Sequence, residues 1–397
     1  MKILLINEEC GTGSTGRICT DIASALEQKG HEAKIVFGRN AAIVPDQYRK
    51  YAVRIGNDID LRVHGMITRG FDATGFGSKK STKIMIEWIR SYQPDVIHLH
   101  NLHGYYINIK LLFDYLKEAG KPVIWTLHDV WPFTGHSAYC DAAGCEKWKN
   151  GCGNCPQIHI YPKSYIDRSR ENWQKKRRIF CGVKHLQIVT PSEWLAGLAR
   201  ESFLGEYPVM VINNGIDTRK FQKIELQKCP IPGGDNKILL LSVATVWSDL
   251  KGLSDFIQLA GKLDDRYQIV LIGGMTKRQE KRLPERILHI PRTQNIEEMV
   301  KLYNAARAYI NLTYCDTYPT VNLEAAACGT PVITYAVGGS TESAVKYGGK
   351  AVKRGDLDAV VETIDDMKEA TMQIPNRNDL DREMTAEKYM SLYRNML

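Results

Sequence analysis

Residues 313–335 read T-Y-C-D-T-Y-P-T-V-N-L-E-A-A-A-C-G-T-P-V-I-T-Y, and this stretch decides the fold class. The short apolar run at 308–312 before it is typical of a buried strand. Pro319 cannot continue that strand, and the alanine-rich residues 321–327 suit a helix that ends at Gly329. Another β-branched run then opens a second strand. This order of strand, loop, helix and strand predicts a parallel α/β sheet.

The loop of this stretch has the features of an anion site. The predicted helix begins at the carboxyl end of a strand, so the free N–H groups of residues 320–322 would point into the crevice above the sheet. Two carboxylates, Asp316 and Glu324, frame the loop with seven residues between them. The structural alternative for this pair is a helix-capping carboxylate and a solvated glutamate.

The same alternation of strands and helices runs through both halves of the chain, on either side of a proline- and glycine-rich stretch at 230–234. A chain of 397 residues is too long for one ordinary core. We therefore predict a Rossmann-like first domain over 1–215 and a Rossmann-like second domain over 235–380, joined by a hinge around a deep interdomain cleft. A last helix over 381–397 can cross back to the first domain.

Composition limits the classes of partner. No apolar run has the length of a membrane span, and Met1 leads directly into a strand, so we expect a cytoplasmic protein without a signal peptide. The net charge of +8 is mild, and basic residues concentrate at 170–178. Such a run is typical of a solvated helix face, and contact with anionic lipid head groups or a phosphorylated acceptor is the alternative. It carries one tryptophan and no recognised binding motif, so we expect no nucleic-acid partner.

The first half places polar residues at the ends of predicted strands. Gly11, Gly13 and Gly16 follow the first strand and precede a helix expected at about 17–29, in a loop suited to a phosphate or a sugar. His128 stands at the carboxyl end of a later strand, on the face where ligands bind in such sheets. Because a lone histidine is often structural, a structural role and a catalytic role both stay open.

A cysteine-rich insertion interrupts the first half over residues 131–161, where regular patterning disappears. It contains Cys140, Cys145, Cys152 and Cys155. In a reducing compartment, four thiolates this close in sequence favour a tetrahedral Zn²⁺ over disulfides, and incidental thiols are the alternative. A closed four-sulfur site would be structural, because it leaves no open position for catalysis.

The second half resembles the retaining GT-B glycosyltransferases known as glycosyl transferases group 1. The hallmark of that family is an acidic residue, seven residues, and a glutamate that leads into E-A-x-A-C-G-T-P-V-I. Here Asp316 and the run E-A-A-A-C-G-T-P-V-I at 324–333 match it, and so do Lys251-Gly252 and L-Y-N-A-A-R at 302–307. The first half is similar to exopolysaccharide transferases of the colanic-acid type, which share W-T-L-H-D-x-W and the cysteine-rich insertion.

This resemblance covers essentially the whole chain and implies an enzyme. It would move a sugar from a UDP- or GDP-linked donor to a growing saccharide, with retention at the anomeric carbon. The implied acceptor is lipid-linked, in exopolysaccharide, capsule or O-antigen biosynthesis, and the enzyme would meet it at the inner surface of the cytoplasmic membrane. The alternatives are a nucleotide-sugar epimerase and a non-catalytic saccharide or nucleotide-sugar binder of the same fold.

The roles of individual residues follow from the same resemblance. Glu324 would bind the ribose hydroxyls, Asp316 the hydroxyls of the donor sugar, and Lys251 the leaving diphosphate. His128 would lie near the sugar's 6-hydroxyl, and Gly16 near the phosphate. The remaining donor contacts would come from the motif loop and from the base-binding segment: Tyr318, Pro319, Thr320, Val321 and Arg292.

Two positions depart from the family pattern. Asp316 replaces the usual glutamate, so its reach is one methylene shorter, and Val246 stands where the family carries an arginine, five residues before Lys251. The family's chemistry needs no metal, and we read the D-x-D at 58–60 as chance. The implied route is front-face attack in which the leaving phosphate accepts the acceptor's proton, with Asp129 as an auxiliary base.

Overall fold

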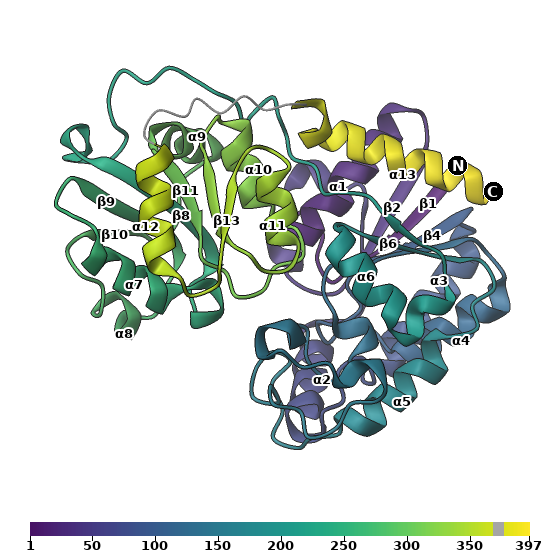
Figure 1. Cartoon of the computed structure of the whole chain (residues 1–397). Helices are drawn as coiled ribbons and strands as arrows, with labels where there is room; N and C mark the ends of the chain where they lie inside the picture. Colours follow the sequence, from purple (N-terminus) through teal and green to yellow (C-terminus); the bar gives the residue numbers. More distant parts are fainter. Residues whose placement is uncertain (368–376) are drawn as a thin grey trace. The chain divides into compact units, whose positions relative to one another are not determined.

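The computed structural model describes residues 1–367 and 377–397. The chain divides into two compact units: unit 1 is Met1–Asn213 with Thr385–Leu397, and unit 2 is Asn214–Met384. Each unit contains its own parallel sheet with helices packed on its faces (Figure 1). The predicted α/β class with two Rossmann-like halves is confirmed.

Unit 1 has a seven-stranded sheet in the order β3-β2-β1-β4-β5-β6-β7, with every neighbouring pair parallel. Its strands are β1 (Lys2–Ile6), β2 (Glu32–Phe37), β3 (Ala52–Arg54), β4 (Val96–Leu99), β5 (Val123–Thr126), β6 (Leu186–Thr190) and β7 (Val209–Val211). Its helices are α1 (Gly13–Gln28), α2 (Asp58–Phe71), α3 (Lys79–Tyr92), α4 (Ile109–Ala119), α5 (Ser169–Phe180), α6 (Glu193–Glu201) and most of α13 (Arg382–Met396).

The strands of unit 1 are apolar on both faces because helices cover both sides of the sheet. In β1, Leu4 and Ile6 belong to one apolar cluster, and Ile3 and Leu5 belong to another on the opposite face. Helix α13 packs into the second cluster through residues such as Tyr393, beside α1 (Figure 1). The last residues of the chain therefore complete the core of the first unit.

Unit 2 has a six-stranded parallel sheet in the order β10-β9-β8-β11-β12-β13. Its strands are β8 (Ile238–Val246), β9 (Tyr267–Gly274), β10 (Ile287–Ile290), β11 (Ala308–Asn311), β12 (Val332–Tyr335) and β13 (Lys350–Val352). Its helices are α7 (Leu253–Lys262), α8 (Lys277–Glu280), α9 (Ile296–Ala305), α10 (Thr320–Ala327), α11 (Gly338–Val345) and α12 (Leu357–Asp366).

Two local predictions need correction. Helix α1 begins at Gly13 rather than near residue 17, so Gly16 lies in the first turn of the helix and not in a loop. The basic run at 170–178 is not a uniformly solvated face, because Lys176 of α5 is only 1% exposed. Its ammonium donates hydrogen bonds to the carbonyl oxygens of Trp131 (2.8 Å) and Thr134 (3.1 Å), and burial lowers its pKa to about 7.

No helix in the described part of the chain is both long enough and apolar enough to cross a membrane.

Candidate active site

The motif at 313–335 lies at the switch point of the unit 2 sheet. The strand order reverses between β8 and β11, and in open α/β sheets ligands bind outside the carboxyl ends of the strands at this point. The segment after β8 forms the short turn η8 (Asp249–Lys251), and the segment after β11 leads into α10. Lys251 and Asp316 therefore lie at the same edge of the sheet, because they follow two neighbouring strands.

Lys251 and Asp316 form an ion pair. The Lys251 Nζ atom lies 2.9 Å from Asp316 Oδ2, and the two side chains are 39% and 21% exposed. Burial acts to lower the pKa of Lys251, but the Asp316 carboxylate more than offsets it, so the pKa is raised. The ammonium is therefore charged at neutral pH and partly accessible, as a group that binds a phosphate must be.

The turn that carries Lys251 is fixed to the motif loop by backbone contacts. The carbonyl oxygen of Leu250 accepts hydrogen bonds from the Tyr314 N–H (2.9 Å) and the Thr313 hydroxyl (3.3 Å). Gly252 has a φ of +77°, and a Cβ at this position would lie 2.3 Å from the carbonyl oxygen of Leu312. The Lys-Gly pair therefore allows the two loops to approach closely.

Replacing Gly252 with alanine is expected to destabilise unit 2 by about 3 kcal/mol, because the side chain adds left-handed strain to a backbone clash. Urea unfolding of the variant measures this loss. Gly261→Ala is the matched control: Gly261 lies in α7 with open space where its Cβ would be, so this variant should be as stable as the wild type or slightly more so. Equal stability of the two variants would show that the close approach at Gly252 is unimportant.

Glu324 lies within α10, is half-buried, and is hydrogen-bonded to a tyrosine of the preceding helix α9. The Tyr303 hydroxyl of α9 donates a 2.9 Å hydrogen bond to Glu324 Oε2. Burial, together with this carboxylate, raises the pKa of Tyr303 well above its usual value, so the phenol stays protonated as a donor. One carboxylate oxygen is thus fixed in place, which orients the group for further hydrogen bonds.

The other predicted donor contacts divide into two groups. Thr320 and Val321 form the first turn of α10, where Pro319 is the N-cap and provides no side-chain hydrogen bond, so their N–H groups suit an anion. The Tyr318 side chain is buried and its carbonyl oxygen accepts a 3.2 Å hydrogen bond from the Asn214 amide, so a donor contact at this position would come from its N–H group. Arg292 is exposed after the edge strand β10, which β9 separates from β8, so the sheet does not bring it beside Lys251.

In unit 1, the segments that follow β1, β2 and β4 meet at the carboxyl edge of the sheet. Glu8 forms an ion pair with Arg39 (3.2 Å) and accepts a 3.4 Å hydrogen bond from the Asn101 amide. Gly16 packs tightly here, because a Cβ at this position would lie 3.2 Å from the carbonyl oxygen of Glu9. This edge is polar, charged and closely packed, although its residues come from distant parts of the sequence.

Three histidines of unit 1 lie in a row at the ends of β4 and β5. His100 Nδ1 and His128 Nε2 share a hydrogen bond of 2.9 Å, and the rings of His98 and His100 have centroids 4.1 Å apart. Burial lowers the pKa of His128 to about 4 and that of His98 to about 3. His128 is therefore neutral at neutral pH, and its neighbour fixes the orientation of its ring.

Asp129 is engaged on both carboxylate oxygens. His103 Nε2 lies 2.7 Å from Oδ2, and the backbone N–H of Trp131 donates to Oδ1 at 2.8 Å. Burial acts to raise the pKa of Asp129, but His103 and this N–H outweigh it, so the pKa is lowered. A carboxylate bound in this way is a weak proton acceptor, which argues against Asp129 as an auxiliary base.

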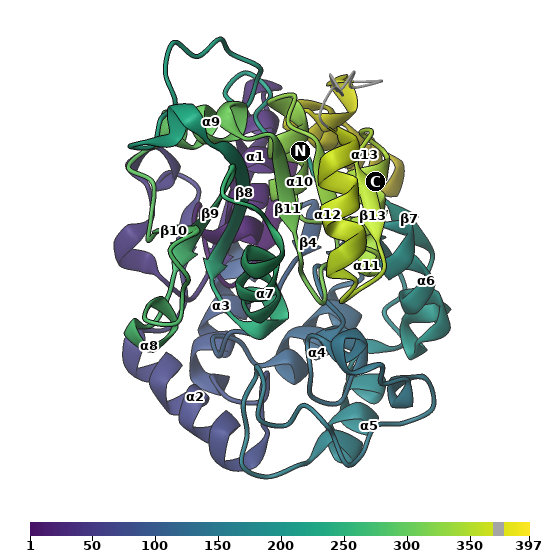
Figure 2. The ribbon, with the colours of Figure 1, turned by 60° about the vertical axis from the view of Figure 1, so that its left-hand side comes forward.

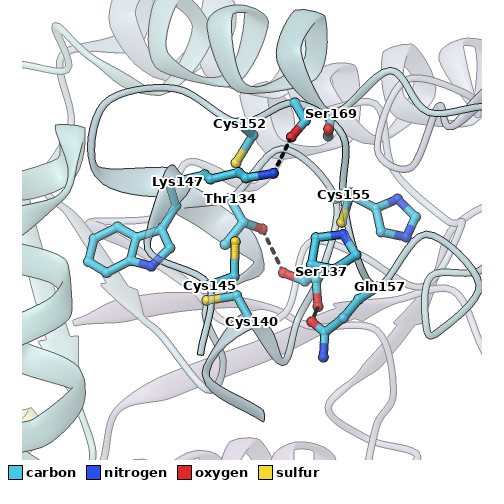
Figure 3. Close-up of a pocket in the computed structure, with 13 residues that line it drawn as sticks. Thr134, Ser137, Cys140, Cys145, Lys147, Cys152, Cys155, Gln157 and Ser169 are labelled. Carbon is cyan, nitrogen blue, oxygen red and sulfur yellow. Dashed lines mark hydrogen bonds between the residues drawn. The ribbon is translucent and has the colours of Figure 1, made fainter. Parts of the chain in front are cut away.

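The four cysteines of the insertion line one small pocket (Figure 3). Cys140 and Cys145 come from the start of the insertion, and Cys152 and Cys155 come from its second part. The backbone N–H of Gly135 donates to Cys152 Sγ at 3.2 Å, and burial raises the pKa of the Cys155 thiol to about 11. Within residues 1–367 and 377–397, however, no three Cys, His, Asp or Glu side chains are arranged so that they could hold a metal ion.

Sequence reasoning assigned no role to two residues that the structure places at these sites. Tyr303, which donates to Glu324, is part of the family motif at 302–307. The motif marked this tyrosine but did not indicate that it binds Glu324. His103 follows His100 by three residues, but its pairing with Asp129 depends on how β4 and β5 align.

Known protein families match both halves of the chain. Residues 15–220 match the family Glycosyltransferase Family 4, and residues 223–385 match Glycosyl transferases group 1. WcaC of Escherichia coli (strain K12), named for glycosyl transfer in colanic acid biosynthesis, is 27% identical over 368 residues, covering 90% of this chain and 88% of its own.

Solved structures show the same fold. Sucrose-phosphate synthase (tll1590) from Thermosynechococcus elongatus has a TM-score of 0.72 at 16% identity, covering 100% of this chain and 98% of its own. Anabaena Alr3699/HepE, solved in complex with UDP and glucose, has a TM-score of 0.67 at 13% identity, and the match covers 100% of both chains. The chain belongs to the retaining glycosyltransferases of family 4, the group 1 enzymes with the GT-B fold.

Proposed function

We propose that this glycosyltransferase moves a hexose from a UDP- or GDP-linked donor to a growing, lipid-linked saccharide of an exopolysaccharide, capsule or O-antigen. The observation that supports donor binding is the Lys251–Asp316 pair beside the N-terminus of α10, at the switch point of unit 2. The names of two similar proteins support the finer statement: HepE was solved with UDP and glucose, and WcaC is named for colanic acid biosynthesis.

The proposed chemistry uses the charges of unit 2. The bond between the anomeric carbon and the diphosphate oxygen breaks, and negative charge develops on the diphosphate next to Lys251 and the N–H groups of α10. The acceptor oxygen forms its bond on the same face of the sugar, and its proton passes to the departing phosphate oxygen. Glu324 holds the ribose hydroxyls, and Asp316 holds hydroxyls of the sugar.

Unit 1 contributes His128 and Gly16 in this proposal. A neutral imidazole can exchange hydrogen bonds with a sugar hydroxyl without introducing a charge, and His100 already orients the ring. Val246 stands where the family pattern has an arginine, and it is 63% exposed. Of the two cations in that pattern, this chain therefore keeps Lys251 for the diphosphate.

A thermal-shift screen of the whole chain against nucleotide sugars identifies the donor, because a true donor stabilises the folded state alone. The stabilising compound is then supplied in radiolabelled form with saccharide acceptors, and the glycosylated product is measured. The Glu324→Ala variant should remain folded and lose product formation, with a lower melting temperature because the buried Tyr303 hydroxyl loses its acceptor. Release of an epimer or of free sugar, with no glycosylated acceptor, would establish the epimerase or hydrolytic alternative instead.

The zinc site in the cysteine insertion stays a prediction. It is supported by four thiols around one pocket, although the present arrangement shows no metal-binding group. Protein purified without added zinc should contain about one Zn²⁺ per chain if the thiols close on a metal. A Cys152→Ser and Cys155→Ser double variant with unchanged metal content and stability would remove the prediction, and Cys181→Ser is the control outside the pocket.

A further inference from the structure

Helix α2 of unit 1 exposes a continuous apolar side. Five of the fifteen large apolar residues that are exposed in the described chain lie on this one helix: Ile59, Val63, Met66, Ile67 and Phe71. Their exposed fractions range from 37% at Ile67 to 69% at Ile59. Residues spaced by four, three, one and four positions share one side of an α-helix, so these side chains form a stripe rather than scattered contacts.

Another side of α2, with His64 and Thr68, is packed within unit 1, so the exposed stripe is not an unfolded edge. His64 is 1% exposed, and its Nε2 accepts hydrogen bonds from the backbone N–H groups of Gly75 (3.2 Å) and Gly77 (3.1 Å). Asn57 caps the helix and forms a capping box with Asp60. One side of the helix therefore packs within unit 1, and the apolar stripe lies on a side that unit 1 does not cover.

A neighbouring loop extends the stripe. The backbone N–H of Tyr165 donates to the carbonyl oxygen of Arg69 at 2.8 Å, which joins this loop to the last turn of α2. Tyr165 is 72% exposed and Ile166 is 44% exposed. We call these two residues, together with the five of the stripe, the α2 surface. Figure 2 shows α2 along the outer edge of unit 1.

Cations border the α2 surface. Arg62 and Arg69 are exposed beside the stripe, and the Arg168 guanidinium lies 5.6 Å above the ring of Phe71. The carboxylates of α2 are confined to its first turn, where Asp58 is paired with Arg54 and Asp60 accepts a hydrogen bond from the backbone N–H of Asn57, the N-cap residue.

An apolar stripe with arginines beside it is the pattern of a helix that lies in the interfacial plane of a membrane. A protein interface would also bury the apolar side. The exposed charges of α2 beyond its first turn, Arg62 and Arg69, are both cations, and Asp167 beside Ile166 already accepts hydrogen bonds from two backbone N–H groups. This charge pattern favours anionic head groups, because they attract each nearby Lys or Arg.

We propose that the α2 surface is the membrane-binding face of this enzyme, with its apolar stripe among the acyl chains and its arginines at anionic head groups. This proposal rests on the proposed function, because the lipid-linked acceptor of that function would lie in the membrane. It places the contact on α2 rather than on the basic run of α5, where Lys176 is buried.

Sedimentation with vesicles tests the proposal. Wild-type protein should bind vesicles of phosphatidylcholine mixed with phosphatidylglycerol more tightly than vesicles of phosphatidylcholine alone. A Met66→Glu and Phe71→Glu double variant should lose at least about tenfold of this binding, because two exposed apolar anchors become anions. Arg62→Ser and Arg69→Ser should each cost about fivefold on the mixed vesicles. Ile43→Glu is the matched control, since Ile43 is 60% exposed in the same unit outside the surface.

Three results would overturn the proposal: no binding of the wild type to mixed vesicles, unchanged binding of the double variant, or a wild-type dimer that the double variant converts to a monomer. Melting temperatures show that each variant is folded. Transfer to a water-soluble saccharide, measured without vesicles, separates the two hypotheses. Vesicle binding without any transfer contradicts the proposed function alone, and transfer without vesicle binding contradicts the α2 surface alone.

Discussion

Lys251→Met is expected to lower kcat by about two to three orders of magnitude, because one preorganised cation at a developing charge contributes on that scale. The wild-type ammonium is charged, partly accessible and 2.9 Å from Asp316. Without it, the Asp316 carboxylate would stand unneutralised beside an anionic donor, so donor affinity should fall as well. Steady-state kinetics with the donor from the thermal-shift screen measures both losses.

Lys262→Met provides the matched control for this variant. Lys262 also lies in unit 2 and forms an ion pair with a carboxylate, Asp358, at 2.6 Å, and it is comparably exposed at 41%. Removing that pair should leave kcat and KM near the wild-type values, since exposed pairs contribute little. If Lys251→Met and Lys262→Met had the same kinetics, Lys251 would not be the diphosphate-binding cation.

Acidification from pH 6.5 to about 4.5 is expected to destabilise unit 1 strongly. His98 is fully buried, and the fall of its pKa from 6.5 to about 3 corresponds to roughly 4–5 kcal/mol over the whole range. As the pH falls below 6.5, the unfolded chain binds a proton at His98, whereas the folded chain does not bind it until the pH nears 3. Stability is therefore fully present above pH 6.5 and is lost as the pH falls toward 3.

Other groups in the same unit modify this slope. His64, with a pKa lowered to about 4, and His100, with a pKa well below 6.5, act in the same direction as His98. His103 acts in the opposite direction, because Asp129 outweighs burial and raises its pKa. The lowered groups outnumber the raised one, so the net effect of acid between pH 6.5 and about 4 is destabilising.

His98→Gln tests the assignment, because glutamine can still exchange hydrogen bonds with Tyr393 and Thr126 but does not titrate. The variant should lose markedly less stability than the wild type between pH 6.5 and about 4.5. Tryptophan fluorescence follows unit 1, since every tryptophan except Trp247 lies there. His185→Gln, at an exposed histidine, should keep the wild-type slope, and an equal slope in His98→Gln would contradict the assignment.

The sequence allowed the fold class and half of the candidate site to be predicted. Asp316 and Glu324 are close in the chain, so the strand, loop and helix between them determine their placement. The contact of Lys251 with Asp316 spans 65 residues and depends on the pairing of β8 with β11. No local pattern specifies such a pairing, and only the family resemblance pointed to Lys251.

The α2 surface illustrates a different limit. The spacing of apolar residues along 59–71 predicts an amphipathic helix, and the ordinary inference would bury that apolar side. In the structure the buried side is the one with His64, which the glycine-containing segment at 75–77 binds through backbone N–H groups. Periodicity identifies the stripe but does not show whether the chain itself covers it.

The return of α13 to unit 1 has a consequence for biosynthesis. A chain leaves the ribosome from its N-terminus, and domains that are continuous in sequence can fold as they emerge. Unit 1 cannot finish in that way, because Tyr389 and Tyr393 fill its core and bond Thr126 and His98 only after the whole of unit 2 has been made. Nascent unit 1 therefore keeps one apolar face uncovered until residues 389–393 have left the ribosome and packed against it.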